Sequence, residues 1–205
     1  QFYLKTFGTP AVAAYGVALR VEQLFLLPVF GLTGALLPIA AQNFGANQSE
    51  RVRMALLTCW KFGWVFMFVA CPLLYFSAPL LMRSFTSDRA VIDIGVSYLR
   101  IDVFVLPLYM MLFAINSFLQ ALKRPIWTLL IGISRQAFGV AFFSFVFVHI
   151  WGFGVVGVWY GIATSVLTGM ILSLFIANQV ALPLVGGIFS GQETRRTNIS
   201  NNHPI

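Results

Sequence analysis

Five ionisable side chains lie inside long apolar stretches of the sequence, where an unpaired charge is costly. They are Arg20, Glu22, Arg100, Asp102 and Arg135. Inside hydrocarbon, each of them costs at least about 2.5–3.5 kcal/mol unless it finds a partner or water. Carboxylates in such surroundings can take up protons, Na⁺ or a cationic ligand, and guanidinium groups can meet a phosphate. We therefore treat these five residues as a candidate cavity for an ion or a substrate.

Their spacing predicts a common depth in the membrane. At 1.5 Å per residue, Glu22 and Asp102 lie roughly 18 and 16 Å from the outer ends of their helices, and Arg135 lies roughly 15 Å from an inner end. Residues two apart, such as Arg20 and Glu22, do not face each other on a helix. We therefore expect ion pairs between helices, for example Glu22 with Arg100 or Asp102 with Arg135. The cluster either lines a pathway or only holds the bundle together.

Weaker candidates for the same cavity are Tyr109, Asn116 and Gln136. Amides in membranes often just bond neighbouring helices, so these side chains need no ligand to account for them. A further set of prolines and glycines predicts helix kinks or close helix packing. This set is Pro28, Gly31, Gly34, Pro107, Gly157 and Gly161.

The composition indicates where these helices lie. The chain is 59% hydrophobic and only 9% charged, whereas soluble domains are about 25% charged. Six acidic and thirteen basic residues cannot cover a water-exposed surface of this size. The fold class is therefore an all-α integral membrane bundle. The net charge of +7 lies at the ends of apolar runs, which argues against a nucleic-acid partner and for a lipid bilayer.

A spanning helix needs about 20 mostly apolar residues. Five stretches meet this requirement, at about 10–44, 52–82, 91–122, 126–150 and 155–179. We expect residues 1–8 to be the end of a preceding helix, because the chain starts without Met and looks like a piece of a longer protein. Residues 1–181 thus form a transmembrane unit, and 182–205 are expected to be a polar, disordered tail.

Basic residues predict the orientation, because they collect in cytoplasmic loops. One side of the predicted bundle carries Arg51, Arg53, Lys123, Arg124, Arg195 and Arg196, with Lys61 nearby, and the other carries Lys5, Arg83 and Arg89. This bias places the C-terminus in the cytoplasm of a multi-pass protein of the cell membrane.

Enzyme and metal chemistry find no support in the sequence. Cys59 and Cys71 lie in apolar stretches without a CxxC or a Cys/His cluster, which predicts buried hydrophobic residues rather than metal ligands. There is no GxxxxGKS, HExxH or GxSxG motif. We expect no catalytic residue and no cofactor.

The first apolar stretch carries a specific pattern. Residues 13–46 read AAYGVALRVEQLFLLPVFGLTGALLPIAAQNFGA, which closely resembles the signature of the multidrug and toxic compound extrusion (MATE) transporters. The matching positions are Ala13, Ala14, Gly16, Arg20, Glu22, Pro28, Gly31, Leu32, Gln42, Asn43, Gly45 and Ala46. Residues 98–125 are similar to the tenth helix of that family, and residues 154–169 to its last helix.

The resemblance implies that the chain is the C-terminal half of a twelve-helix transporter, from the end of helix seven through helix twelve. It also implies export of small organic cations or drugs in exchange for Na⁺ or H⁺, with an N-terminal lobe of the same protein as the other half. Some members carry a coupling carboxylate on helix ten, where this chain has Tyr109 or a neighbour. Either Asp102 takes that role, or the coupling acid lies in the other lobe.

A related flippase for lipid-linked saccharides or lipid precursors is the alternative. The distinguishing observation is whether Glu22 and Asp102 neutralise the intramembrane arginines or leave them free to meet a phosphate. A third possibility is a membrane scaffold or an inactive remnant that transports nothing.

Overall fold

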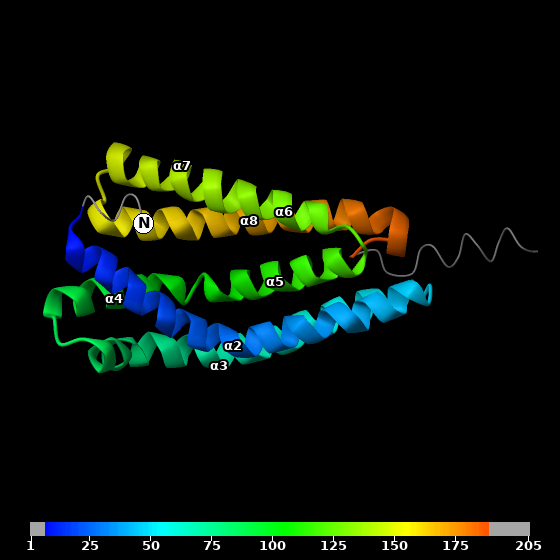
Figure 1. The fold of residues 1–205 in the computed structure, drawn as a ribbon, viewed down its shortest axis with the longest axis horizontal. Helices are drawn as coiled ribbons and strands as arrows, with labels where there is room; N and C mark the ends of the chain where they lie inside the picture. Colours follow the sequence, from blue (N-terminus) through cyan, green and yellow to red (C-terminus); the bar gives the residue numbers. More distant parts are fainter. Residues whose placement is uncertain (1–6, 189–205) are drawn as a thin grey trace, which may run out of the picture.

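The computed structural model describes residues 7–188, and this part of the chain is helical throughout. Figure 1 shows the helices running roughly along one common axis, joined by short turns. Their bounds are α2 Thr9–Gly45, α3 Ser49–Phe85, α4 Arg89–Asp102, α5 Leu106–Ala121, α6 Pro125–Ile133, η1 Ser134–Gly139, α7 Val140–Phe145, η2 Val146–Ile150 and α8 Gly154–Val185.

Four helical segments are long and apolar enough to cross a membrane, and α4 with α5 makes a fifth if the bent pair is one span. The predicted all-α membrane bundle is therefore confirmed. Each predicted apolar stretch is helical, and α8 continues through Val185, past the predicted start of the tail at residue 182. The predicted helix end at residues 1–6 and the remainder of the tail, 189–205, lie outside the described residues.

The third span is broken near its middle, which hydropathy alone does not reveal. Helices α4 and α5 meet at an angle of 57° across Val103–Val105. Pro107 contributes to this break, because it has no N–H to donate to the carbonyl of Val103. Instead, the turn is closed by the N–H of Val105, which donates to the carbonyl of Asp102 at 2.7 Å.

The fourth span, Pro125–Ile150, is continuous but not α-helical throughout. Its segments η1 and η2 are π-helical, so their turns are wider than those of the α-helix. In η1, the N–H of Val140 donates to the carbonyl of Arg135. The hydroxyl of Ser165 on α8 donates to the same carbonyl at 2.8 Å, which fixes η1 against α8.

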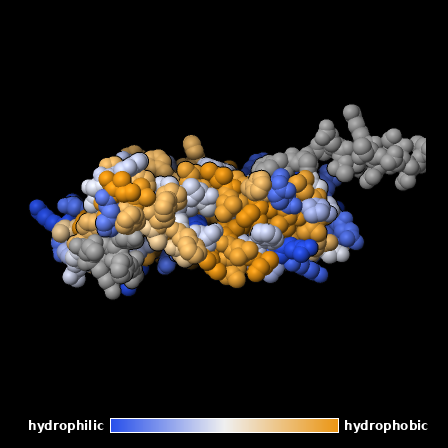
Figure 2. Space-filling model, turned by 90° about the horizontal axis from the view of Figure 1, so that it is seen from above, coloured by the Kyte–Doolittle hydropathy of each residue, from blue (hydrophilic) through white to orange (hydrophobic). Residues whose placement is uncertain are grey.

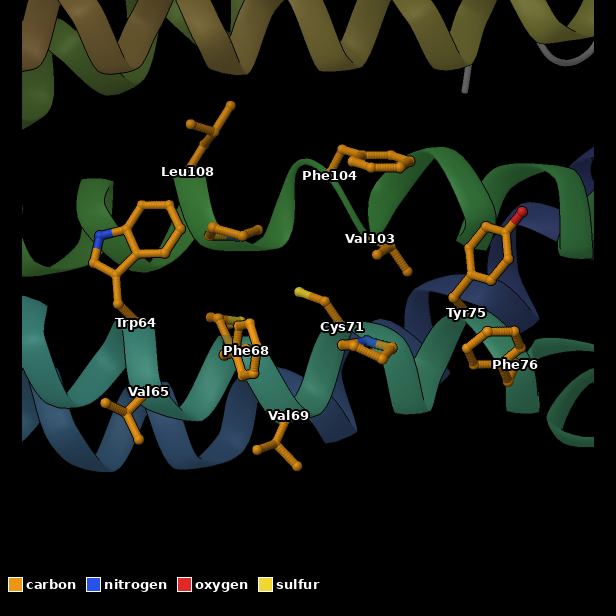
Figure 3. Close-up of a pocket in the computed structure, with 13 residues that line it drawn as sticks. Trp64, Val65, Phe68, Val69, Cys71, Tyr75, Phe76, Val103, Phe104 and Leu108 are labelled. Carbon is orange, nitrogen blue, oxygen red and sulfur yellow. The ribbon is translucent and has the colours of Figure 1, made fainter.

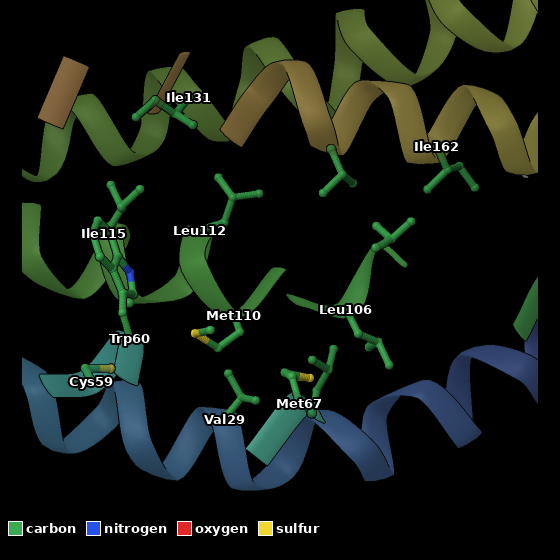
Figure 4. Packing of buried hydrophobic residues seen from close by; sticks show 14 of the residues in the cluster. Val29, Cys59, Trp60, Met67, Leu106, Met110, Leu112, Ile115, Ile131 and Ile162 are labelled. Carbon is green, nitrogen blue, oxygen red and sulfur yellow. The ribbon is translucent and has the colours of Figure 1, made fainter. Parts of the chain in front are cut away.

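The apolar core lies where α2, α3, α5 and α8 meet. Figure 4 shows side chains from these helices pointing toward one another, with Met67 of α3 and Met110 of α5 between the ribbons. Both methionines are fully buried. Figure 2 shows apolar side chains over the middle of one face and hydrophilic ones gathered toward both ends, as expected for a protein surrounded by lipid.

Two glycines of α8 stand where the fourth and fifth spans touch. A Cβ atom on Gly157 would lie 3.0 Å from the backbone of Phe147, and one on Gly161 would lie 2.6 Å from the backbone nitrogen of Ser144. The predicted glycines of α2 differ. A Cβ atom on Gly31 or Gly34 would meet nothing within 4 Å, so neither marks a close approach to a described residue.

Candidate functional site

Two carboxyl groups from different helices lie close together inside the bundle. Glu22 of α2 is 6% exposed and Asp102 of α4 is 2% exposed. Tyr98, one helical turn before Asp102 on α4, is hydrogen-bonded to Glu22 on α2, so the two acids lie on facing sides of these helices. The structure thus brings the two candidate acids into one part of the bundle.

Three aromatic side chains pack together beside Glu22. The hydroxyl of Tyr98 donates to Glu22 Oε2 at 2.5 Å. The ring of Tyr98 packs edge-on against Tyr15 at 5.4 Å between centroids and against Trp159 at 4.9 Å, and Tyr15 stacks on Trp159 at 5.6 Å. Trp159 is only 1% exposed. The two other rings therefore pack around Tyr98, the hydrogen-bond donor to Glu22.

The Asp102 carboxyl lies inside the bundle, at the C-terminal end of α4. Asp102 is the last residue of α4, and the C-terminal end of a helix carries partial negative charge. Its Oδ2 atom is buried and makes no hydrogen bond within the described residues. An ionised carboxylate in these surroundings needs a compensating positive charge, and Na⁺ or a proton could supply it.

The predicted ion pairs of Glu22 with Arg100 and of Asp102 with Arg135 do not form. Within residues 7–188, the structure contains no ion pair for either arginine with these acids, and Arg20 and Arg100 are exposed. Arg20 and Arg100 each stand two residues before a buried acid, so they lie on a different face of the same helix. The guanidinium of Arg100 lies over the Tyr75 ring instead, 5.4 Å from its centroid.

Arg135 of η1 contacts Tyr109 of α5. Its guanidinium lies over the ring of Tyr109, 5.5 Å from the centroid. The aliphatic part of Arg135 runs against Gly169, where an added Cβ would stand 2.8 Å from its Cδ atom. A side chain at position 169 would therefore displace Arg135 from this position.

The two predicted amides lie elsewhere, in a groove of about 540 Å³ between α5 and the fourth span. Asn116, Thr128 and Gln136 line this groove. The side-chain oxygens of Asn116 and Thr128 are buried and lack a hydrogen-bond partner among the described residues. Gln136 is the exposed one of the three, so it is the polar side chain that a solute in the groove can reach, and neither Glu22 nor Asp102 lines the groove.

Three aromatic members of the site were not predicted. Helical periodicity contains the signal for two of them, because Tyr98 lies four residues before Asp102 and Tyr15 lies seven before Glu22, each on the same helix face. Trp159 comes from α8, and no pattern in its own helix connects it with the acids. No group of three or more His, Cys, Asp or Glu side chains within residues 7–188 could hold a metal ion.

Known proteins share both the sequence and the fold. A family model described as MatE matches residues 1–146. A relative named "FAD transporter" from Shewanella oneidensis is 36% identical over 132 residues, which are 61% of this chain and 28% of that protein. The "Probable multidrug resistance protein NorM" of Thermotoga maritima is 25% identical over 174 residues, which are 82% of this chain and 36% of that protein.

A solved structure extends the likeness to nearly the whole chain. The structure described as "MATE transporter ClbM in complex with Rb+" superposes with a TM-score of 0.79 at 20% identity, covering 98% of this chain and 44% of that one. The chain thus spans about a third of the length of the curated relatives and less than half of the solved structure.

Proposed function

Because the chain belongs to the MatE family of membrane transporters, we propose that it forms one lobe of a secondary antiporter that exports small organic molecules in exchange for Na⁺ or H⁺. In this proposal the chain is the C-terminal lobe, from the end of helix seven through helix twelve. The N-terminal lobe of the same protein supplies the other wall of the pathway. The membrane is the cell membrane, and the end that carries Arg51 and Lys123 faces the cytoplasm.

The buried pair of Glu22 and Asp102 carries this proposal. Transporters place their coupling-ion sites near the middle of the bilayer, often at discontinuous helices whose C-terminal ends and carboxylates attract the cation. Here the pair stands at the break between α4 and α5, and Oδ2 of Asp102 has no other hydrogen-bond partner within residues 7–188. Asp102 thus takes the role that a carboxylate on helix ten has in some members of the family.

The pair gives the coupling ion a way to act on the helices. When Glu22 and Asp102 are both ionised, they repel each other and favour a separation of α2 from α4. A proton or Na⁺ between them removes that repulsion and draws the two helices together. Because Tyr98 is hydrogen-bonded to Glu22, its ring moves with the carboxyl, so binding of the ion can change the packing around Trp159.

The substrate class has two candidates. Multidrug exporters among the relatives favour drug-like organic cations, which the resemblance also implies. The alternative is an anionic solute, a lipid-linked saccharide or a lipid precursor. The observation that favours it is that Glu22 and Asp102 do not neutralise the intramembrane arginines within residues 7–188. A relative named as a transporter of FAD, which carries phosphates, is in line with this alternative.

Efflux from cells that express the full-length protein tests the proposal. A fluorescent organic cation is loaded, and a Na⁺ or a H⁺ gradient is imposed in turn. We expect one gradient to drive efflux, and we expect Glu22→Gln and Asp102→Asn each to abolish the gradient dependence at equal protein levels. Glu50→Gln, an exposed acid at the start of α3, is the matched control.

Unchanged efflux in both carboxyl variants would refute the role of the pair. Absence of efflux under either gradient, with good expression, would refute export of organic cations. Membrane vesicles prepared from the same cells would then be assayed with a flavin dinucleotide and with a fluorescent lipid-linked saccharide.

A further inference from the structure

A long apolar groove runs along the outside of the bundle between α3 and the break of α4 and α5. Its volume is about 970 Å³, and its lining includes Trp64, Phe68, Tyr75, Phe76, Phe104 and Leu108. Figure 3 shows Trp64 pointing from α3 toward α5 and Tyr75 pointing from α3 toward α4, on either side of Val103 and Phe104. Three of these side chains are among the most exposed large apolar groups described, with Phe68, Phe76 and Phe104 at 82%, 80% and 74% exposure.

The groove owes its shape to the helix break. A straight helix would pack along α3 for its whole length, but the 57° bend opens space at Val103–Val105. Pro72 on α3 and Pro107 on α5 line the groove on either side of this point. Among the lining residues on α3, Trp64, Phe68, Cys71 and Tyr75 recur at intervals of three or four, so they form one continuous stripe along the helix.

The groove has the length of one lipid leaflet. From Trp64 to Tyr75 it extends along α3 for about 17 Å at 1.5 Å per residue. Half of a hydrocarbon core of about 30 Å is about 15 Å. A single acyl chain, lying parallel to the helices as lipid chains do, therefore matches the groove in direction, length and polarity.

A positive charge stands at one end of this groove. The guanidinium of Arg100 lies over the ring of Tyr75, a lining residue, and it forms no ion pair within residues 7–188. Arg89, Asp93 and Arg100 are exposed and lie on the same face of α4. At 100° per residue, their directions around the helix axis differ by at most about 40°. Arg100 lies eleven residues, or about 17 Å of helix, from the start of α4. Its long side chain can extend from that level toward the membrane surface, where it can meet a lipid headgroup.

We propose that this groove is a binding site for an anionic phospholipid, with one acyl chain along α3 and the phosphate on Arg100. The charge-assisted hydrogen bonds between a guanidinium and a phosphate supply the headgroup preference, and the stripe of aromatic side chains supplies the chain contact. Neither Glu22 nor Asp102 lines the groove, so the proposal does not depend on their coupling role.

Lipid binding to the full-length protein, purified in a neutral detergent, tests the headgroup contact. Native mass spectrometry compares phosphatidylglycerol with phosphatidylcholine of the same acyl chains. We expect phosphatidylglycerol to bind about tenfold more tightly, which corresponds to about 1.4 kcal/mol. Arg100→Gln should remove this preference. Arg20→Gln should keep it, because Arg20 is an exposed arginine eleven residues from the start of α2, as Arg100 is from the start of α4.

A second measurement locates the acyl chain. Phosphatidylglycerol with a brominated chain should quench the fluorescence of Trp64, and Trp64→Phe should remove that part of the quenching. The proposal fails if Arg100→Gln keeps the preference, if Arg20→Gln loses it equally, or if the quenching is the same in Trp64→Phe. It also fails if a photo-crosslinker placed at Phe68 joins a protein segment instead of lipid.

Discussion

Replacing Gly161 by alanine should destabilise the contact between α8 and α7, because the added methyl group would meet the main chain of Ser144. The Cβ atom would stand 2.6 Å from the nitrogen and 2.7 Å from the Cα atom of Ser144. Ordinary van der Waals contacts of this kind begin near 3.4 Å. A backbone cannot swing aside as a flexible side chain does, so the two helices must separate along this contact.

The magnitude follows from the cost of overpacking a close contact, which is typically about 1–3 kcal/mol. Alanine gains up to about 1 kcal/mol over glycine in helix propensity, but a denatured state that stays helical in detergent shares most of this gain. We therefore expect Gly161→Ala to lower the free energy of unfolding by about 1–2 kcal/mol.

The measurement is the unfolding of the full-length protein in mixed micelles with increasing dodecyl sulfate, followed by tryptophan fluorescence. Gly132→Ala on α6 is the control, because a Cβ atom there would meet nothing within 4 Å. Its stability should stay within about 0.5 kcal/mol of the parent or rise. If Gly161→Ala were as stable as Gly132→Ala, the close approach of α7 and α8 would be refuted.

Three further predictions rest on single contacts. Asp88→Ala removes the helix cap in which the Asp88 carboxylate accepts a hydrogen bond from the N–H of Ala90 at 2.9 Å. It should lower the free energy of unfolding by about 1 kcal/mol and speed amide hydrogen exchange in the first turn of α4. Asp88→Ser, which keeps a capping oxygen, should retain most of the protection from exchange. Tyr98→Phe leaves the buried Glu22 without its hydrogen-bond donor, so it should lower the free energy of unfolding by about 1–3 kcal/mol. Tyr160→Phe is the control, because Tyr160 is exposed, and an equal effect of this variant would contradict the reasoning. Pro107→Ala restores an N–H that can donate to the carbonyl of Val103, so the 57° bend between α4 and α5 should straighten. The distance between spin labels at positions 93 and 120 should then increase. An unchanged distance distribution would show that packing alone holds the bend.

Hydropathy predicted the elements well because lipid imposes a simple rule on them. Every spanning backbone must satisfy its own hydrogen bonds, so an apolar stretch of sufficient length becomes a helix. This rule placed the segments at 10–44 and 155–179 inside α2 and α8. The signature at residues 13–46 identified the family, and the family match confirms it.

The pairing of the charges could not be predicted from the sequence. The position of a residue along its helix gives its depth, but it does not give the direction in which the side chain points. Glu22 and Asp102 do share a level, but the direction of each side chain depends on how far each helix is rotated about its axis. That rotation buries the acids and leaves Arg20 and Arg100 exposed. The position of Trp159 against Tyr98 depends on the packing of α8, which is a contact between residues 61 positions apart. Hydrophobic periodicity in a single helix contains no information about such contacts.

The π-helical turns of the fourth span affect how sequences of this family should be aligned. A π-turn typically accommodates one extra residue, and one residue corresponds to 100° around a helix axis. Relatives with a regular α-helix in this segment would need a one-residue gap opposite Ser134–Gly139 and another opposite Val146–Ile150. An alignment without those gaps would pair residues that face α8 in one protein with residues that face lipid in the other, and it would assign the position of Arg135 to the wrong side chain.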